Sequence, residues 1–513
     1  MKLKYSLLSL VLLMGTSCND SFLDRAPKDE QSDVSFWRDA EDAVKYTTGT
    51  YRYLIAPENH IIMTDCYTDN AVPVHVGAEQ GQLSSGTATA SNPHFKQVWQ
   101  TAYDGIRRCD IYFANIGQVT MDDKKKEVLT GEITYLRAFF YATLVKYFGG
   151  VPILTQALEL NEPIPARNTD EEVYNFIVKE LDKAAGMLPL QRTELSEVGR
   201  ATKGAALSLK AKMSNYFHKY DVAAKTAKEV MDLGIYGLND NYENLFLPEY
   251  ENNKEVIFDR QYVQNAYNST IGSLIDQYFS PVMMGGWEAI SPSQDLVDAY
   301  PCKDGKSIKE SKLYNPEKPF ENRDPRLAFS ILWDGQKLAG KTYESKTMGD
   351  GNITRTGYCM RKYVNPKNDG NNDYGWTNFI YIRYADILLT YAEAQNELTG
   401  PDASVYAAIN QVRQRPSVEL PPLAAGLNKD QMRNAIRLER RLEFTFEGIH
   451  LFDTRSWRTT EADVKKPVYG KIVNGKHFLV EQRSFNPDRD YLWAIPLTEI
   501  DLSKGTLTQN PNY

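Results

Sequence analysis

The stretch RYADILLTYAEAQNELTGPDASVYAAINQVRQRP, residues 383–416, decides the fold of this chain. Its first half has apolar residues at helical spacing up to Gly400 and Pro401, which end a helix. Asp402 then supplies the N-cap of a second helix. The inner face of this second helix is made of Val405, Ala408, Ile409 and Val412. We therefore predict two helices that pack against each other and are joined by a tight turn.

Small side chains in the first helix allow the second helix to approach closely. They are Ala385, Ala392 and Ala394. Close pairs of this kind are typical of tetratricopeptide repeats, although this chain has no strict repeat of about 34 residues. Pro416 shortens the second helix, since proline lacks the N–H group that a helix interior needs.

Helical patterns continue outward from this pair along most of the chain. Residues 131–150 carry one apolar stripe and end at two glycines. The stripe is made of Leu136, Phe140, Leu144 and Phe148. Further helices are predicted at residues 41–54, 94–118, 171–187, 202–216 and 221–233.

Two long stretches between the helices have no regular pattern. They are residues 68–93 and residues 262–380, of which the second is rich in Gly, Pro and Asn with short-strand patterns. Long irregular segments in a compact protein tend to carry function. The predicted architecture is therefore mainly α, a helical scaffold that carries elaborate loops.

Composition limits the classes of partner. The chain has 513 residues, 42% of them hydrophobic and 25% charged, which is ordinary for a globular protein. Its net charge is -8, and no basic run is longer than residues 124–126, so nucleic acid and anionic membrane surfaces are not expected partners. The 32 tyrosines outnumber the 20 phenylalanines. Because tyrosine combines an apolar ring with a polar hydroxyl, this excess suits a protein with many partly solvent-exposed aromatic side chains.

The first 17 residues have the pattern of an export signal. Lys2 and Lys4 precede an apolar run at residues 7–14, which is shorter than the roughly 20 residues that span a bilayer. Cys18 follows the small residues Gly-Thr-Ser, a pattern that resembles a bacterial lipobox, with Gly15 where an aliphatic residue is usual. The resemblance implies that residues 1–17 are removed, that Cys18 is acylated, and that residues 18–35 form a lipidated tether. The alternative is an ordinary secreted protein with an incidental cysteine.

The other cysteines do not indicate a metal site. Cys66, Cys109, Cys302 and Cys359 are widely spaced and form no C-x-x-C motif. A chain of this size does not need disulfides to fold. We therefore predict free thiols, most of them buried.

Several ordered stretches resemble one known family. They are CNDSFLDRAP (18–27), GEITYLRAFFYATLVKYFGGVPIL (131–154), SPSQDLVDAY (291–300), NRDPRL (322–327), IRYADILLTYAEAQNEL (382–398), IRLERRLEFTFEGIHLFDTRSW (436–457), YLWAIPLTEI (491–500) and LTQNPNY (507–513). Together they resemble the SusD/RagB family, the outer-membrane nutrient-binding lipoproteins of Bacteroidetes-type bacteria. Their order along nearly the whole chain is what makes the resemblance specific.

The resemblance implies both a fold and a role. The expected fold is a single unit over residues 36–513, with tetratricopeptide-like helix pairs and a loop-rich, short-strand-containing, ligand-facing insert at about residues 238–380. The expected protein lies at the cell surface, anchored in outer-membrane lipid through Cys18. It binds a glycan and delivers it to a SusC-like TonB-dependent transporter, and it needs no cofactor.

The sequence does not predict an enzyme. Glu439, Glu443 and Glu447 share one helical face, as paired catalytic carboxylates would. However, three arginines interleaved with them predict ordinary ion pairs within the helix. These are Arg437, Arg440 and Arg441. The six histidines form no metal motif, and Asp369 and Asp373 in residues 365–375 lack the spacing of a calcium loop.

Glycan binding needs exposed aromatic faces beside amide and carboxylate groups that pair sugar hydroxyls. Trp287 follows two glycines in residues 278–293, with Tyr278 and Phe279 nearby, and is the strongest candidate. The other candidate ligand-binding residues are Tyr278, Trp376, Tyr374, Asn378, Asp69, Asn70 and His75. In contrast, the tryptophans expected in the core are Trp37, Trp99, Trp457 and Trp493.

Two other functions stay open at this point. A nutrient receptor of the same fold that binds peptide or protein would need an apolar helical groove. A secreted hydrolase would turn over its bound oligosaccharide. Exposed Tyr and Trp beside Asn and Asp favour the glycan.

Overall fold

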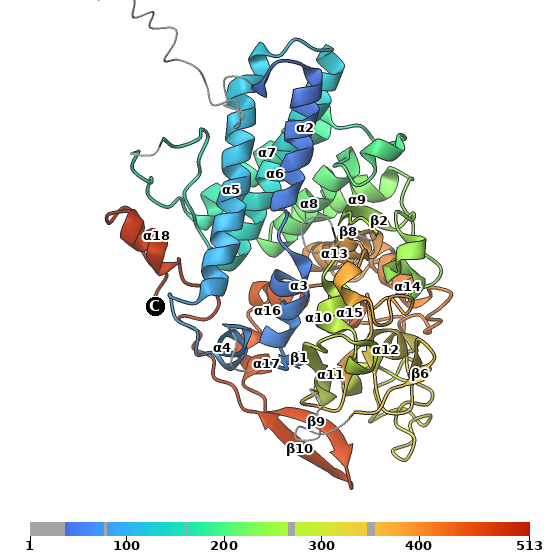
Figure 1. The fold of residues 1–513 in the computed structure, drawn as a ribbon. Helices are drawn as coiled ribbons and strands as arrows, with labels where there is room; N and C mark the ends of the chain where they lie inside the picture. The colour runs from blue at the N-terminus through green and yellow to red at the C-terminus, as the bar shows by residue number, and fades with distance from the viewer. Residues whose placement is uncertain (1–35, 76–78, 160–161, 265–271, 346–353) are drawn as a thin grey trace, which may run out of the picture.

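The computed structural model describes residues 36–75, 79–159, 162–264, 272–345 and 354–513 and shows a mainly helical protein (Figure 1). The scaffold helices are α2 (Ala40–Thr50), α5 (Pro93–Asn115), α6 (Asp123–Phe148), α7 (Asp170–Met187), α8 (Lys203–Tyr216), α9 (Tyr220–Asp232), α13 (Tyr384–Thr399), α14 (Ala403–Arg413) and α15 (Lys429–Glu443). Each of the helices from α5 to α9 packs on the next, α9 packs on α13, and α13 packs on α14 and α15. The predicted mainly helical fold is confirmed.

The helix ends follow the capping signals in the sequence. Thr202 caps α8 and Asp402 caps α14, each with its side chain accepting from backbone N–H groups of the first turn. In α7, Thr169 and Glu172 form a capping box. Gly400, at φ 82°, terminates α13, and α14 ends at Arg413, three residues before Pro416. The predicted helix pair at residues 383–416 is therefore confirmed.

Helix α6 differs from its prediction. It begins at Asp123, about two turns earlier than the predicted start, and it is buried on nearly every side between Gly131 and Phe148. The reason is that α6 packs on α2, α5, α7 and α8 at once, so it has no broad solvent face. The predicted single stripe was therefore too narrow.

The remaining elements are short. The helices are α3 (Pro57–His60), α4 (Glu79–Ser85), α10 (Ile275–Phe279), α11 (Gln294–Ala299), α12 (Pro325–Ser330), α16 (His450–Ser456), α17 (Thr460–Val464) and α18 (Leu497–Leu502). The strands are β1 (Ala71–Pro73), β2 (Val256–Arg260), β3 (Ile290–Pro292), β4 (Ile331–Leu332), β5 (Lys337–Leu338), β6 (Lys341–Thr342), β7 (Cys359–Met360), β8 (Phe379–Arg383), β9 (Val468–Val473) and β10 (Lys476–Glu481). Residues 68–93 are therefore not wholly irregular, because they contain β1 and α4.

The strands form two-stranded antiparallel pairs, β1–β3, β2–β8, β4–β7, β5–β6 and β9–β10. The β1–β3 pair joins residues that lie more than 200 positions apart in the chain, with Val72 opposite Ser291. The β2–β8 pair places the start of α13 beside the middle of the chain. These long-range pairs attach the loop-rich half to the scaffold.

A buried ion-pair network fills the junction between these halves. Glu443 is fully buried and accepts hydrogen bonds from Arg326 (2.8 Å), Arg383 (2.7 Å) and Arg415 (2.9 Å). Glu255 bridges Arg383 and Arg415 from the other side. Because these guanidinium groups surround it, the pKa of Glu443 lies well below its usual range despite the burial.

This network corrects one prediction. The predicted structural role of the three glutamates is retained, but their partners are not the interleaved arginines of α15. Glu439 pairs with Arg326 and Arg413, and Glu447 pairs with Arg383 and Lys362. The arginines on α15 point elsewhere, since burial on a central helix brings other segments closer than its own neighbours.

The cysteine prediction is confirmed, because Cys66, Cys109, Cys302 and Cys359 are free and buried. Trp37, Trp99 and Trp493 lie in the core as predicted, whereas Trp457 is half-buried and donates to Glu393 from its indole N–H. No helix among the described residues is long and apolar enough to cross a membrane. The described part of the chain also contains no group of His, Cys, Asp and Glu residues suited to a metal ion.

Candidate functional site

The exposed Trp287 and the half-buried Tyr278 form a pair of rings that we call the aromatic platform. The Trp287 side chain is 44% exposed, an unusual state for so large an apolar group. Its ring lies 4.9 Å from the Tyr278 ring, at an interplanar angle of 48°. The two rings thus present a combined apolar surface to solvent, with the Tyr278 hydroxyl at one edge.

The chain path after α10 holds Trp287 outward. The backbone N–H of Trp287 donates to Gln277 (2.8 Å), and that of Ala289 donates to Tyr278 (2.8 Å), so the chain doubles back on the helix. The turn needs glycine twice. Gly285 has φ 88°, and a Cβ on Gly286 would lie 2.2 Å from the Ser280 carbonyl oxygen. The backbone conformation of this turn therefore explains why two glycines precede Trp287.

Polar groups surround the platform and come from different segments. Asn59, in α3, donates from Nδ2 to the Tyr278 hydroxyl at 3.1 Å, and α3 contacts α10. Gln277 donates from Nε2 to Asp373 Oδ1 at 2.6 Å. The amide and carboxylate groups needed to pair sugar hydroxyls thus lie beside the aromatic faces.

Residues 365–376 are fixed to the underside of this turn. Asn372 donates from Nδ2 to the Met284 carbonyl (2.9 Å). The buried Asp276 accepts from the Asn365 backbone (2.9 Å) and from Asn368 Nδ2 (2.8 Å). Burial raises the pKa of Asp276 to about 6, because no cation lies close enough to offset the loss of water.

Residues 68–75, which contain β1, reach the platform through the β1–β3 pair. Val74 extends this pair by donating its backbone N–H to the Ala289 carbonyl (3.0 Å), and the exposed His75 follows it. Glu288, between Trp287 and Ala289, is buried and has a left-handed backbone at φ 48°. Such a conformation is unfavourable for a non-glycine residue and often marks functional sites. Glu288 is held there because its carboxylate accepts from the Tyr343 hydroxyl.

Asp69 and Asn70 are buried and already have polar partners. Asp69 pairs with Arg441 (3.0 Å) and His450 (2.9 Å). Asn70 donates to Asp65 (2.6 Å) and accepts from Arg441 (2.8 Å). These contacts hold the base of β1, and the role of the two residues in pairing sugar hydroxyls stays a prediction.

The third candidate segment, residues 374–378, is less exposed than Trp287. Asn378 is buried, and its side-chain oxygen accepts from the Tyr262 backbone N–H (2.8 Å). Tyr374 and Trp376 are half-buried, on either side of Gly375, whose carbonyl accepts from the Ser273 backbone N–H (2.7 Å). The role of these three residues in ligand binding stays a prediction.

Sequence reasoning missed Asn59 and Gln277 as polar neighbours of the platform. Asn59 lies 219 positions from its partner Tyr278, and no local pattern could join them. Gln277 directly precedes Tyr278, so the sequence alone could have indicated it as a polar neighbour of the platform. Asp373 was noticed only as part of a weak calcium-like run.

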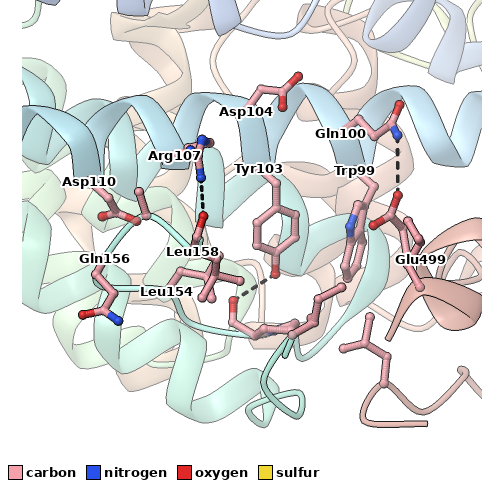
Figure 2. Close-up of a pocket in the computed structure, with 15 residues that line it drawn as sticks. Trp99, Gln100, Tyr103, Asp104, Arg107, Asp110, Leu154, Gln156, Leu158 and Glu499 are labelled. Atoms are coloured by element: carbon pink, nitrogen blue, oxygen red, sulfur yellow. Dashed lines mark hydrogen bonds between the residues drawn. The ribbon is translucent and has the colours of Figure 1, made fainter. Parts of the chain in front are cut away.

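A separate cavity of about 350 Å³ lies on the helical scaffold (Figure 2). Its walls are α5, residues 152–158 with Ile164, and the segment around α18. Tyr103 donates from its hydroxyl to the Pro152 carbonyl (2.9 Å), and Arg107 donates to the Leu158 carbonyl (2.6 Å). The lining is largely apolar and includes Trp99, Leu154, Leu158, Ile164, Leu502 and Leu507. This cavity is the apolar groove that a peptide ligand would need.

The fold and the aromatic platform define a binding protein built on paired helices. The sequence model of the SusD family matches residues 254–513, and a second model, described as "Starch-binding associating with outer membrane", matches residues 21–214. The chain therefore belongs to the SusD family. The prediction that the chain is not an enzyme is confirmed, because the SusD family consists of binding proteins. The description of the second model includes association with the outer membrane.

Individual relatives support this assignment. A SusD-like protein of Bacteroides fragilis is 31% identical, with a TM-score of 0.83 over 95% of this chain and 100% of that chain. A SusD-like carbohydrate binding protein of Bacteroides fragilis is 27% identical, with a TM-score of 0.86 over 92% of this chain and 100% of that chain. SusD-like protein P2 of Formosa agariphila is 25% identical, over 99% of this chain and 100% of its own length.

Proposed function

We propose that this protein is a cell-surface receptor that binds an oligosaccharide or polysaccharide at the aromatic platform. The single observation that carries the proposal is the exposed Trp287 ring in contact with the half-buried Tyr278 ring, with polar side chains at the edges of the pair. The C–H face of a sugar ring can stack on such rings, while its hydroxyls pair with amide and carboxylate groups. The carbohydrate-binding description of a relative 27% identical to this chain supports the same ligand class.

The test is calorimetric titration of the chain without residues 1–18 against plant, fungal and bacterial polysaccharides, in parallel with Trp287→Ala. We expect one glycan class to bind, and we expect the substitution to weaken binding at least tenfold, equivalent to about 1.4 kcal/mol. Val282→Ala is a matched control, since Val282 lies in the same turn and is 39% exposed. Unchanged binding by folded Trp287→Ala would remove the platform from the proposal.

The proposal includes a lipid anchor and a transporter. Residues 1–17 would be the signal peptide and Cys18 the acylated first residue of the mature chain; both lie outside the described residues. Two or three acyl chains hold a protein firmly in a bilayer, since each buried methylene contributes about 0.8 kcal/mol. We expect Cys18→Ser to lose labelling by a palmitate analogue and to leave the membrane fraction. Labelled, membrane-bound Cys18→Ser would contradict the anchor.

Delivery of the glycan to a SusC-like TonB-dependent transporter rests on family membership. Purification of the tagged, lipidated chain from solubilised outer membranes tests this step. We expect a TonB-dependent barrel to co-purify in a fixed ratio, identified by mass spectrometry. A chain that purifies alone, while still binding glycan, would restrict the proposal to capture.

The second candidate is a peptide-binding receptor of the same fold, and the cavity beside α5 favours it. Apolar side chains of a peptide would fill the space between α5 and residues 152–158. Leu502→Asp, at an exposed position on the rim, would weaken peptide binding and leave glycan binding at the platform unchanged. Binding of peptides that depends on Leu502, with no response to any glycan, would replace the first proposal.

A further inference from the structure

The β9–β10 hairpin projects from the edge of the molecule, and its strand β9 packs on α11 (Figure 1). Two cavities, of about 380 Å³ and about 260 Å³, lie along α11 beneath the hairpin. Both are lined by Gln294 and Asp298, so they meet at α11. We call the combined space the hairpin groove. Its larger part lies within the usual size range of small-molecule sites, about 300–1,000 Å³.

One wall of the groove is aromatic. The rings of Phe320 and Trp333 are stacked, with centroids 4.2 Å apart and an interplanar angle of 13°. Both side chains are half-buried, and both line the larger cavity together with Tyr314 and Tyr358. A flat, partly exposed pair of rings is the surface on which a pyranose ring stacks. Trp333 was not among the residues that the sequence indicated.

Polar groups with fixed orientation line the same cavity. Tyr358 donates from its hydroxyl to Gln294 Oε1 (2.7 Å), and Gln294 donates from Nε2 to Asp298 Oδ1 (2.8 Å). This relay leaves Asp298 half-buried at the junction of the two cavities. Burial raises the pKa of Asp298. The relay thus holds the Asp298 carboxyl group at the wall of a partly solvent-excluded cavity.

Arg323 adds a second polar anchor. Its side chain is 4% exposed and donates to the carbonyls of Val297 (2.6 Å) and Tyr300 (2.7 Å). Its Nε–H has no hydrogen-bond partner among the described residues, and Arg323 lines the larger cavity. A buried donor without a partner is costly, about 1–3 kcal/mol, unless water or a ligand supplies the acceptor. A sugar hydroxyl is such an acceptor.

The charges in the larger cavity are balanced. Lys471 pairs with Asp334 at 2.6 Å across the mouth, and the other facing charges are Asp298 and Arg323. These lining residues therefore carry no excess of positive or negative charge that would favour an anionic or a cationic ligand. The combination of stacked rings, a carboxylate–amide relay and balanced charge fits a neutral, hydroxyl-rich ring.

The hairpin is anchored firmly enough to form a lasting wall. Lys471 donates its backbone N–H to the Thr356 carbonyl (2.7 Å), and Arg355 pairs with Glu481 at 2.8 Å. Gly357, at φ 87°, allows this approach, since a Cβ there would lie 2.4 Å from the Lys471 side chain. The groove is thus built into the fold by contacts at both strands of the hairpin.

We infer that the hairpin groove is a second carbohydrate-binding site, which takes a neutral oligosaccharide with a sugar ring stacked on the Trp333–Phe320 wall. It goes beyond the proposed function, because the platform and the groove share no residue. Two sites on one receptor raise the avidity for a polymer long enough to reach both, without any new contact at either site.

The test is ¹⁹F NMR of protein labelled with 5-fluorotryptophan, in which each of the 7 tryptophans gives its own signal. Trp333→Phe and Trp287→Phe assign the signals of the groove and the platform. The probes are maltohexaose, cellohexaose, laminarihexaose, xylohexaose and mannohexaose, added separately. We expect at least one probe to shift the Trp333 signal saturably, in the wild-type chain and equally in Trp287→Ala.

Tyr314→Ala is the second variant, since Tyr314 lines the groove without belonging to the stacked pair. It should raise the midpoint of the Trp333 response several-fold, whereas Leu195→Ala, at a position 92% exposed elsewhere, should not. A Trp333 signal that no probe moves, or that moves only while Trp287 is intact, overturns the inference. A Trp287 response alone would leave the proposed function standing without the second site. A Trp333 response alone would support the groove and count against the platform.

Discussion

At the scale of single residues, Glu443 shows how burial changes the meaning of a motif. In the sequence it is one of three carboxylates on a helix face, next to arginines at helical spacing. In the structure it is fully buried, and its hydrogen-bond partners come from α12, β8 and the segment after α14. Helical spacing correctly indicated a structural role, but only the tertiary fold identifies the partners.

Removing this carboxylate should destabilise the whole protein. Glu443→Ala leaves the guanidinium groups of Arg326, Arg383 and Arg415 with a missing acceptor in a dry interior. Breaking a buried ion pair in this way costs about 3–5 kcal/mol. The free energy of unfolding, measured with guanidinium chloride, should fall by that amount.

A surface pair provides the comparison for this prediction. Glu461 pairs with Lys465 across one turn, and both side chains are well exposed. Glu461→Ala should change the free energy of unfolding by no more than about 0.5 kcal/mol. If Glu443→Ala were as mild as Glu461→Ala, the network would not contribute as described.

Asp276 is buried under the aromatic platform. We expect its contribution to the free energy of unfolding to depend on pH with the opposite sign to that of an ion-paired acid. Its folded-state pKa of about 6 lies above the usual value of about 3.9. Between these pH values the folded protein keeps a proton that the unfolded chain has released. The contribution of Asp276 to the free energy of unfolding therefore falls as the pH rises from about 4 to about 6, by at most about 3 kcal/mol.

The comparison of wild-type protein with Asp276→Asn isolates this contribution. Unfolding curves measured across that pH range should show a smaller decline for the variant. Direct titration of the Asp276 carboxyl carbon by ¹³C NMR gives the pKa independently. Parallel pH profiles for the two proteins would show that Asp276 titrates normally.

At the scale of elements, the turn after α10 decides whether Trp287 faces solvent. Gly286→Ala places a Cβ where the Ser280 carbonyl oxygen lies. The turn must then open, and the Trp287 and Tyr278 rings lose their relative position. We expect glycan affinity to fall by roughly tenfold or more. The melting temperature should change little, because the turn lies at the surface.

Gly117→Ala serves as the control for this prediction, since the space around Gly117 is open and its φ is ordinary. Calorimetric titration and melting curves of both variants separate affinity from stability. Equal glycan affinity in Gly286→Ala and the wild-type chain would show that the backbone turn does not position the platform.

The elements also show what the sequence could and could not predict. The starts of α7, α8 and α14 and the end of α13 followed local capping signals, so these bounds could be read directly. The full length of α6 and the presence of β1 and α4 could not, because their stability depends on distant partners. The exposure of Trp287 was indicated by its two preceding glycines. The burial of Asp69, Asn70 and Asn378 was not indicated, since their partners are far away in the chain.

At the scale of the whole molecule, the described residues form contacts that join early and late segments repeatedly. Arg483 donates to the carbonyls of Thr68 and Ala71, and the Trp493 backbone donates to the Tyr147 carbonyl (2.7 Å). The division predicted from the sequence, one unit over residues 36–513, is consistent with these contacts and stays a prediction.

A single unit should unfold in one step. Scanning calorimetry of the chain without residues 1–18 should give one transition, with equal calorimetric and van't Hoff enthalpies. The loop-rich insert contributes Glu255 and Arg326 to the central network, so it should not melt separately from the helices. Two resolved transitions would show that the scaffold and the insert are independent domains.

The network around Glu443 also constrains how this sequence can diverge. Its members belong to segments distributed from Glu255 to Glu447, yet each charged group is balanced by another inside the same dry volume. A lone replacement leaves an unpaired charge, whereas a joint replacement by apolar groups of similar volume can be neutral. We expect substitutions at Arg326 among descendants of this sequence to be accompanied by substitutions at Glu439 or Glu443. The cluster would then be inherited as one character, although its members are scattered along the gene.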